Sequence, residues 1–209
     1  MMDWQLDPAE ARVLGSLMEK ESATPEYYPL SLNALVNACN QKSNREPVVS
    51  YDENVVEAAL EGLRNQGLAL RISGRDVRVP KHAQRFTEKF NLGRREAAVM
   101  CLLMLRGPQT VGELRGRSER LYTFDDLEAV ESTLARLAEM EFVKKLARLP
   151  GSREARWGHL LCGDVEELEE PAELHTAEKG PSDRERIAAL EQEVTELRRM
   201  LEELRRAFE

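Results

Sequence analysis

A polar segment between two expected helices holds the side chains best suited to recognise a nucleic acid. It is the run Asn40, Gln41, Lys42, Ser43, Asn44 and Arg45. Asn and Gln amides suit adenine edges, and Arg suits guanine or a phosphate. The alternative is a structural turn, in which Asn and Ser cap helix ends and Arg45 pairs with Glu46 or another carboxylate. The sequence leaves both interpretations open.

Three further groups of basic residues could contact phosphates, which would add affinity without reading base sequence. The first group lies on an expected β-hairpin, the second follows a short expected helix, and the third lies on a second expected hairpin. In chain order they are Arg71, Arg75, Arg78, then Arg115, Arg117, Arg120, then Lys144, Lys145, Arg148, Arg153 and Arg156. The alternative is that most of these side chains are solvated or pair with nearby Glu residues.

Residue patterns for catalysis or metal binding are missing from the sequence. His82, His159 and His175 are far apart, and none forms a metal-spaced pair with Cys or an acid. The sequence contains no G-x-S-x-G, P-loop or G-x-G-x-x-G motif. We therefore expect no enzymatic activity, no metal and no cofactor.

The elements that would position the polar segment are three helices followed by a hairpin. Each helix is expected to begin at an N-cap residue with local capping partners. The expected helices run from Asp7 to Glu21, from Ser31 to Cys39 and from Ser50 to Gly67, the last with Glu53 completing a capping box. Residues 68–72 and 77–79 read as the two strands of the hairpin. This order is that of a winged helix, with the hairpin as the wing.

The same order recurs in the second half. Residues 82–91 are expected to form a short connecting helix, and three helices and a hairpin follow. Their expected positions are 96–105, a short helix capped by Thr110 and Glu113, 125–139, and strands at 142–149 and 154–160. The fold class is therefore mainly α with small β-hairpins (α+β), with winged-helix domains at residues 1–80 and 81–162. The apolar run 97–105 is expected to serve both as core and as a contact between the halves.

The C-terminal region has a different character. Residues 163–183 are acidic and read as a linker. Residues 184–209 read as a coiled-coil helix with a strict heptad seam, which favours a parallel homodimer. The seam consists of Ile187, Leu190, Val194, Leu197, Leu201 and Leu204, followed by Phe208. The alternative is a lone helix that folds back on its own domain.

Charge, cysteine usage and hydropathy limit which classes of partner and which cellular compartment the sequence allows. The net charge is −8, but residues 81–162 hold 15 Lys and Arg against 11 Asp and Glu. Both expected third helices are acidic, so a DNA groove would repel them. Cys39, Cys101 and Cys162 are odd in number and widely spaced, which suits a reducing cytosol. The N-terminus has no signal-peptide pattern and the longest apolar run is too short for a membrane helix, so we expect a cytoplasmic protein.

Two segments carry a resemblance to a known family. LDPAEARVLGSLMEKE (6–21) and TPEYYPLSLNALVNACNQKSNREPV (24–48) closely resemble the YceH family of uncharacterised bacterial proteins, and the string NQKSNREP is the specific part. The resemblance covers about residues 5–160. It implies a pair of winged-helix domains that are of DNA-binding type by fold. It supplies no catalytic residues.

Two functions follow as hypotheses. The first is a regulatory or chromosome-associated protein that binds double-stranded DNA through the 40–45 loop and the wings. The second is a protein–protein interaction scaffold without DNA binding, because winged-helix pairs also serve in assemblies and fold does not fix function. The acidic third helices favour the scaffold, whereas the basic wings and the polar loop favour DNA.

Overall fold

The computed structural model describes residues 5–73, 79–148 and 154–164. All of them belong to one compact unit that spans residues 1–168. The expected coiled coil at 184–209, with its self-association residues, lies outside the described residues, as does the expected linker from residue 165 onward. Helices and small antiparallel sheets alternate along the described chain, so the fold is α+β as expected.

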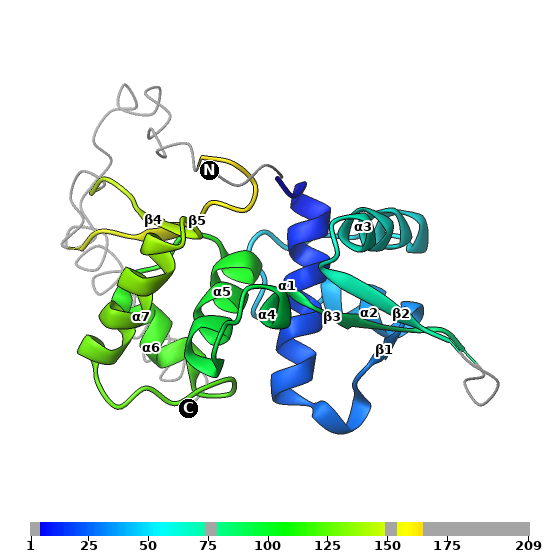
Figure 1. The fold of residues 1–209 in the computed structure, drawn as a ribbon, viewed down its shortest axis with the longest axis horizontal. Coiled ribbons are helices and arrows are strands. Elements are labelled where there is room, and N and C mark those ends of the chain that lie inside the picture. Colours follow the sequence, from blue (N-terminus) through cyan, green and yellow to red (C-terminus); the bar gives the residue numbers. More distant parts are fainter. Residues whose placement is uncertain (1–4, 74–78, 149–153, 165–209) are drawn as a thin grey trace, which may run out of the picture. The chain divides into compact units, whose positions relative to one another are not determined.

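The first half of the unit has three α-helices and a three-stranded sheet (Figure 1). Its elements are α1 Pro8–Ala23, the 3₁₀ turn η1 Pro25–Tyr27, β1 Leu30–Ser31, α2 Leu32–Cys39, α3 Glu53–Asn65, β2 Ala69–Ile72 and β3 Lys81–Gln84. The strand order is β1-β3-β2, with both pairs antiparallel. Leu30 lies opposite His82, and Leu70 lies opposite Ala83.

The second half repeats the order with a smaller sheet. Its elements are α4 Phe86–Lys89, α5 Arg94–Arg106, α6 Val111–Ser118, α7 Leu127–Glu139, β4 Val143–Lys145 and β5 Trp157–His159. The two strands pair antiparallel, with Lys144 opposite Gly158. The expected hairpin is confirmed, but its strands are shorter than the sequence pattern predicted.

Local capping explains where several helices begin. Asp7 and Glu10 form a reciprocal capping box at α1, and Thr110 and Glu113 do the same at α6. Ser31 caps α2 as predicted. The prediction for α3 was wrong by two residues: Asp52, rather than Ser50, accepts the backbone hydrogen bond of the first turn. An Asp carboxylate is also the better partner for the helix dipole.

The second strand of the first hairpin was also predicted in the wrong place. The apolar residues near Val79 suggested a strand at 77–79, but β3 is Lys81–Gln84 and Val79 is exposed. Residues 82–85 were accordingly misread as part of a helix, and α4 covers only Phe86–Lys89. The strand has little β-propensity of its own, and its pairing with both β1 and β2 supplies the hydrogen bonds that fix it.

Helices α1 and α5 pack side by side and join the two halves (Figure 1). Gly15 permits the close approach, because a Cβ atom there would lie 3.1 Å from the Leu105 side chain and from Met104 Cβ. The Cys101 thiol donates a hydrogen bond to the Gly15 carbonyl at 3.4 Å. Every residue from Ala98 to Leu105 is buried. The prediction that the apolar run is both core and inter-half contact is confirmed.

Within residues 5–73, 79–148 and 154–164, no helix is long and apolar enough to cross a membrane. The element order in each half is the order expected for a winged helix. The division into domains at residue 80, and the winged-helix assignment itself, stay predictions.

Candidate nucleic-acid interface

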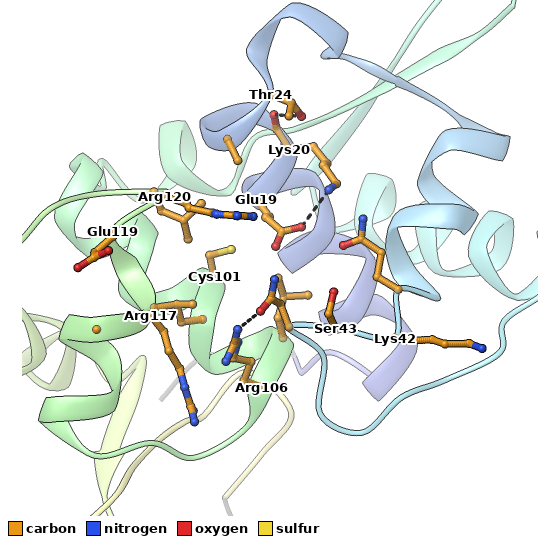
Figure 2. A pocket seen from close by; sticks show the side chains of 17 residues that line it. Glu19, Lys20, Thr24, Lys42, Ser43, Cys101, Arg106, Arg117, Glu119 and Arg120 are labelled. Carbon is orange, nitrogen blue, oxygen red and sulfur yellow. Dashed lines mark hydrogen bonds and ion pairs between the residues drawn. The ribbon is translucent and has the colours of Figure 1, made fainter.

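A cleft of about 1110 Å³ opens where the polar loop after α2 faces the second half. Its walls are the C-terminal turns of α1 and α5, the loop, and the end of α6 (Figure 2). The loop contributes Gln41, Lys42, Ser43 and Asn44. The other half contributes Arg106, Arg117 and Arg120, among others. Two groups of predicted site residues, some 70 positions apart in sequence, therefore line the same cleft.

Basic residues outnumber acidic ones in the lining of this cleft. The basic set is Lys20, Lys42, Arg106, Arg117 and Arg120, and the acidic set is Glu19 and Glu119. We call the five basic residues the cleft cations. The charge of Glu19 is already compensated, because its carboxylate pairs with Arg45 at 2.6 Å and with Lys20 at 3.4 Å. The cleft therefore carries net positive charge, and concave surfaces of one sign concentrate the field that attracts counter-ions.

Arg45 holds the loop in place and does not face solvent. Its side chain is 0% exposed and forms bidentate hydrogen bonds to Glu19, at 3.0 and 2.6 Å. It also donates to the carbonyl of Ala38 at 3.0 and 3.1 Å. Burial alone would raise the pKa of Glu19, but the hydrogen bonds and charge of Arg45 hold that pKa below its ordinary value. These contacts fit the interpretation of Arg45 as a structural residue of the turn.

Asn40 is likewise engaged in the turn. Its side-chain amide donates to the Tyr51 carbonyl at 2.7 Å, and its carbonyl oxygen accepts from the Tyr51 backbone N–H at 2.8 Å. These two bonds close the loop between α2 and α3. Asn44 accepts a hydrogen bond from Arg106, and the Glu46 N–H donates to the Leu105 carbonyl at 2.8 Å. The loop is thus anchored to α5 at the edge of the cleft.

The cleft cations differ in how much of their bonding capacity is used. Lys42 and Arg120 are exposed and form no hydrogen bond or ion pair with any residue in the described part of the chain. Arg117 is exposed, donates a hydrogen bond to Gln109 at 2.9 Å and pairs with Glu113 at 3.3 Å. In Figure 2 the Arg120 side chain extends toward Glu19, whereas Lys42 points outward from the cleft. A ligand could therefore meet Arg120 inside the cleft and Lys42 at its border.

Arg106 is the cation most affected by its neighbours. Burial lowers its pKa, the nearby charges of Arg117 and Arg45 lower it further, and the charges of Glu19 and Glu113 offset only part of this lowering. Its buried Nε atom has no hydrogen-bond partner among the residues that the structure describes. Like charges held this close repel one another, and an anion between them would relieve the repulsion. The cleft is therefore suited to an anionic group such as a phosphate.

Outside the 40–45 loop and the cleft, the structure describes six of the predicted basic residues, and four of them already have partners. Arg115 donates to the Asp125 carbonyl at 2.8 Å, and Lys144 pairs with Asp164 at 3.0 Å. Arg156 pairs with Glu113 at 2.9 Å, and the Lys145 ammonium lies 6.0 Å from the ring centroid of Trp157. Local pairing accounts for these four residues.

Arg71 and Arg148 are exposed and do not line the cleft. The predicted residues Arg75, Arg78 and Arg153 lie outside the described residues. The sequence reasoning also missed two cleft cations, Lys20 and Arg106. Each lies in the last turn of a helix, where a basic residue usually signals only a favourable interaction with the helix dipole.

The exposed faces of α3 and α7 carry the opposite charge. On α3 the exposed acids are Asp52 at the N-cap and Glu53, Glu57 and Glu61 in the helix. On α7 they are Asp125 and Asp126 at the start, then Glu128, Glu131 and Glu139. The only basic residue on an exposed position of α7 is Arg136, which pairs with Glu96 at 3.3 Å. These faces would repel a phosphate backbone.

The described side chains offer no site for metal chemistry. Within those ranges no group of three or more His, Cys, Asp or Glu side chains is placed to hold a metal ion. Cys39 and Cys101 are buried, and burial raises the pKa of both thiols, so neither is a ready thiolate. What the arrangement offers chemically is reversible binding of an anion.

The chain is an α+β protein with a basic cleft, and its sequence places it in a defined family. Residues 6–152 match the model of the family described as "Protein of unknown function, DUF480". A "UPF0502 protein" of Solibacter usitatus is 71% identical over 208 residues, which cover 100% of both chains. A "UPF0502 protein" of Citrifermentans bemidjiense is 54% identical and covers 93% of this chain and 90% of the relative.

A third relative bears the name that the sequence resemblance suggested. The "UPF0502 protein YceH" of Salmonella arizonae is 45% identical over 210 residues, with 97% of each chain covered. The chain therefore belongs to the DUF480/UPF0502 family, and the predicted resemblance to YceH is confirmed.

Proposed function

We propose that this protein binds double-stranded DNA by holding the phosphate backbone in the basic cleft between two winged-helix halves. It acts as a binding protein of regulatory or chromosome-associated type and not as an enzyme. The observation that carries the proposal is the convergence of the cleft cations from two halves of the chain on one concave surface. Contacts to phosphate supply most of the affinity of non-specific DNA binding.

The proposed contact surface differs from that of a typical helix-turn-helix reader. In such a reader the recognition helix enters the major groove. Here the corresponding helices, α3 and α7, expose rows of carboxylates. The cleft lies instead beside the loop that precedes α3, and its side chains are guanidinium, ammonium, amide and hydroxyl groups. Because no helix carries these groups into the major groove, we expect them to contact mainly the phosphate backbone.

The proposal includes a cytoplasmic homodimer. The heptad seam from Ile187 to Leu204 favours two parallel chains. Two copies would present two clefts to one duplex, so affinity would rise through the effective concentration of the second site.

A second candidate function is a protein–protein scaffold. The observation that favours it is the exposed acidic face of α3, which suits a basic partner surface more than a polyanion. On this alternative the cleft cations would contact acidic side chains of a protein partner.

The test is binding of the purified full-length protein to a fluorescently labelled duplex of mixed sequence across a salt series. The slope of log K against log salt is about −0.9 per phosphate contacted. Contacts from most of the cleft cations predict a slope of about −3 to −5. A flat salt dependence, or the lack of binding at low salt, would contradict DNA binding and favour the scaffold.

A further inference from the structure

A second cavity lies on the other side of the loop that borders the cleft. It has a volume of about 290 Å³. Its walls are the N-terminal turns of α1, the loop residues Pro47, Val49 and Tyr51, the end of α5, and β5 with the segment that follows it. Leu103 and Met104 of α5 face this cavity, whereas Leu102, Leu105 and Arg106 of the same helix face the cleft. The two hollows are therefore distinct sites with shared walls.

The lining of the cavity is largely apolar, with a few polar groups. Ala11, Val49, Leu103 and Met104 supply apolar surface, and Pro8, Pro47 and Pro108 add three rings. Small-molecule sites usually combine such a lining with a few placed polar groups. A water molecule takes about 30 Å³ in the liquid, so the cavity holds a ligand of roughly ten non-hydrogen atoms.

Two of the polar lining residues have buried nitrogen atoms whose hydrogen-bonding capacity is not met within the described chain. They are Arg12 Nε and His159 Nδ1. The other Arg12 nitrogens donate only to backbone carbonyls, to Cys39 at 3.3 Å and to Pro47 at 2.6 Å. Buried polar atoms are normally paired, so both residues have unmet hydrogen-bonding capacity at the cavity wall, although these two nitrogens themselves are not exposed to the cavity.

The charge of Arg12 is also uncompensated. Arg12 as a whole residue is 4% exposed, and it forms no ion pair with any residue in the described ranges. Burial lowers its pKa, and the charge of Arg45 lowers it further. Two carboxylates line the same cavity, but Asp164 pairs with Lys144 and Glu46 is exposed. A buried cation without a counter-ion is costly unless an anion joins it.

We infer that this cavity binds a small apolar molecule that carries one carboxylate group. The carboxylate pairs with the uncompensated charge of the Arg12 guanidinium, and the apolar body packs on Val49, Leu103 and Met104. Burial lowers the pKa of His159 to about 4, so its imidazole is neutral near pH 7 and can donate or accept a single hydrogen bond. An aryl- or alkyl-acetate has the size and polarity that this lining accommodates.

Occupancy of the cavity is expected to alter the cleft through the loop. Glu46, Pro47, Val49 and Tyr51 form part of the cavity wall, and residues 41–44 of the same loop form part of the cleft wall. A ligand that contacts the first set shifts the loop and changes DNA affinity. This consequence rests on the proposed function, whereas binding of the carboxylate itself does not.

The test uses phenylacetate as probe and phenylacetamide as its neutral counterpart. The full-length protein carries ¹³C-labelled methionine methyl groups, and the Met104 methyl signal is followed during titration, with Met18 as a remote reference. We expect saturable shifts at Met104 with a dissociation constant of about 1 mM or below. Phenylacetamide is expected to bind at least tenfold more weakly. Equal binding of both probes, or no shift with phenylacetate up to about 10 mM, would overturn the inference.

Two variants locate the site. Arg12→Met removes the guanidinium and is expected to weaken phenylacetate binding at least tenfold while leaving phenylacetamide unchanged. Val49→Phe fills part of the cavity from a half-buried loop position and is expected to weaken both probes. The matched control is Val55→Phe, at an exposed position of α3 outside the cavity. If Val49→Phe bound phenylacetate as the wild type does, the cavity would not be the site.

The closing measurement separates the ligand site from DNA binding. The labelled duplex is titrated with saturating phenylacetate or phenylacetamide. A change of threefold or more in DNA affinity with phenylacetate alone supports the coupling. Methionine shifts without any change in DNA affinity would overturn the coupling and retain the site. Shifts in a protein that binds no DNA would retain the site and overturn the proposed function.

Discussion

The cleft and the exposed faces of α3 and α7 differ in charge although they belong to the same pair of helical units. The cleft gathers cations from α1, the loop, α5 and the α6 end, whereas the third helices expose carboxylates. In helix-turn-helix proteins the recognition helix enters the major groove, whereas α3 and α7 here expose carboxylates and are poorly suited to a polyanion. The difference teaches that element order does not identify the binding surface, and that side-chain chemistry on each face must be examined.

The largest expected effect is a loss of stability. It distinguishes Arg45, which holds the loop in place, from the cleft cations, which we propose bind DNA. Arg45→Met removes one partner of a buried pair and leaves Glu19 uncompensated. We expect the free energy of unfolding to fall by about 3–5 kcal/mol, measured by urea denaturation. The control Arg71→Met, at an exposed position, should change stability by less than about 0.5 kcal/mol. A stable Arg45→Met protein that had lost DNA affinity would place Arg45 among the binding residues.

The second effect concerns the α1–α5 contact that brings the cleft walls together. Gly15→Val places side-chain atoms where Leu105 and Met104 already lie, at 3.1 Å from a Cβ. We expect a loss of about 1–3 kcal/mol in unfolding free energy. Gly112→Val is the matched control, because the nearest atom to its Cβ is Thr110 Oγ1 at 4.0 Å. Equal losses in both variants would contradict a cost that comes from the inter-half contact, because Gly→Val by itself slightly raises helix propensity.

The third effect is the pH dependence of the pair that anchors the loop. The pKa of Glu19 is lowered in the folded state. Its stabilisation is therefore complete above the unfolded-state pKa of about 4.3 and is lost as the pH falls through the lower folded-state value. Glu19→Gln should cost about 1–2 kcal/mol at pH 7, and the difference from wild type should shrink below about pH 4. A difference that grew in acid would contradict this account.

The smallest effect tests the acidic side of the comparison. Glu57→Gln/Glu61→Gln removes two exposed charges from α3. If α3 repels the duplex from nearby, DNA affinity should rise about threefold at low salt and the gain should vanish at high salt. Fluorescence anisotropy at two salt concentrations is sufficient. A gain that persisted in high salt would mean that α3 touches the DNA.

Local signals in the sequence located most of the elements. The capping boxes at Asp7 and Thr110 involve residues three positions apart, so they can be read without the fold. The strand β3 could not be read, because Lys81–Gln84 is held by pairing with β1, about 50 residues earlier. Element type therefore followed from local pattern, whereas strand position depended on distant partners.

The candidate site was predictable only in part, for the same reason. Gln41–Asn44 and the Arg117–Arg120 segment could be singled out by residue type, and the structure brings them into one cleft. Burial of Arg45 depends on Glu19, 26 positions earlier, so the sequence offered its pairing with a carboxylate only as an alternative and could not identify the partner. Arg106 and Lys20 became cleft residues only through the packing of α1 on α5.

The most direct test of the central claim compares two double variants that remove the same charge from different surfaces. Lys42→Gln/Arg120→Gln neutralises two cleft cations, and Arg71→Gln/Arg148→Gln neutralises two exposed cations outside the cleft. DNA affinity is measured across a salt series for both. The cleft pair is expected to lose about tenfold in affinity and to flatten the salt slope by about 1.8, while the other pair stays near wild type. Equal losses, or a loss confined to Arg71 and Arg148, would contradict binding in the cleft.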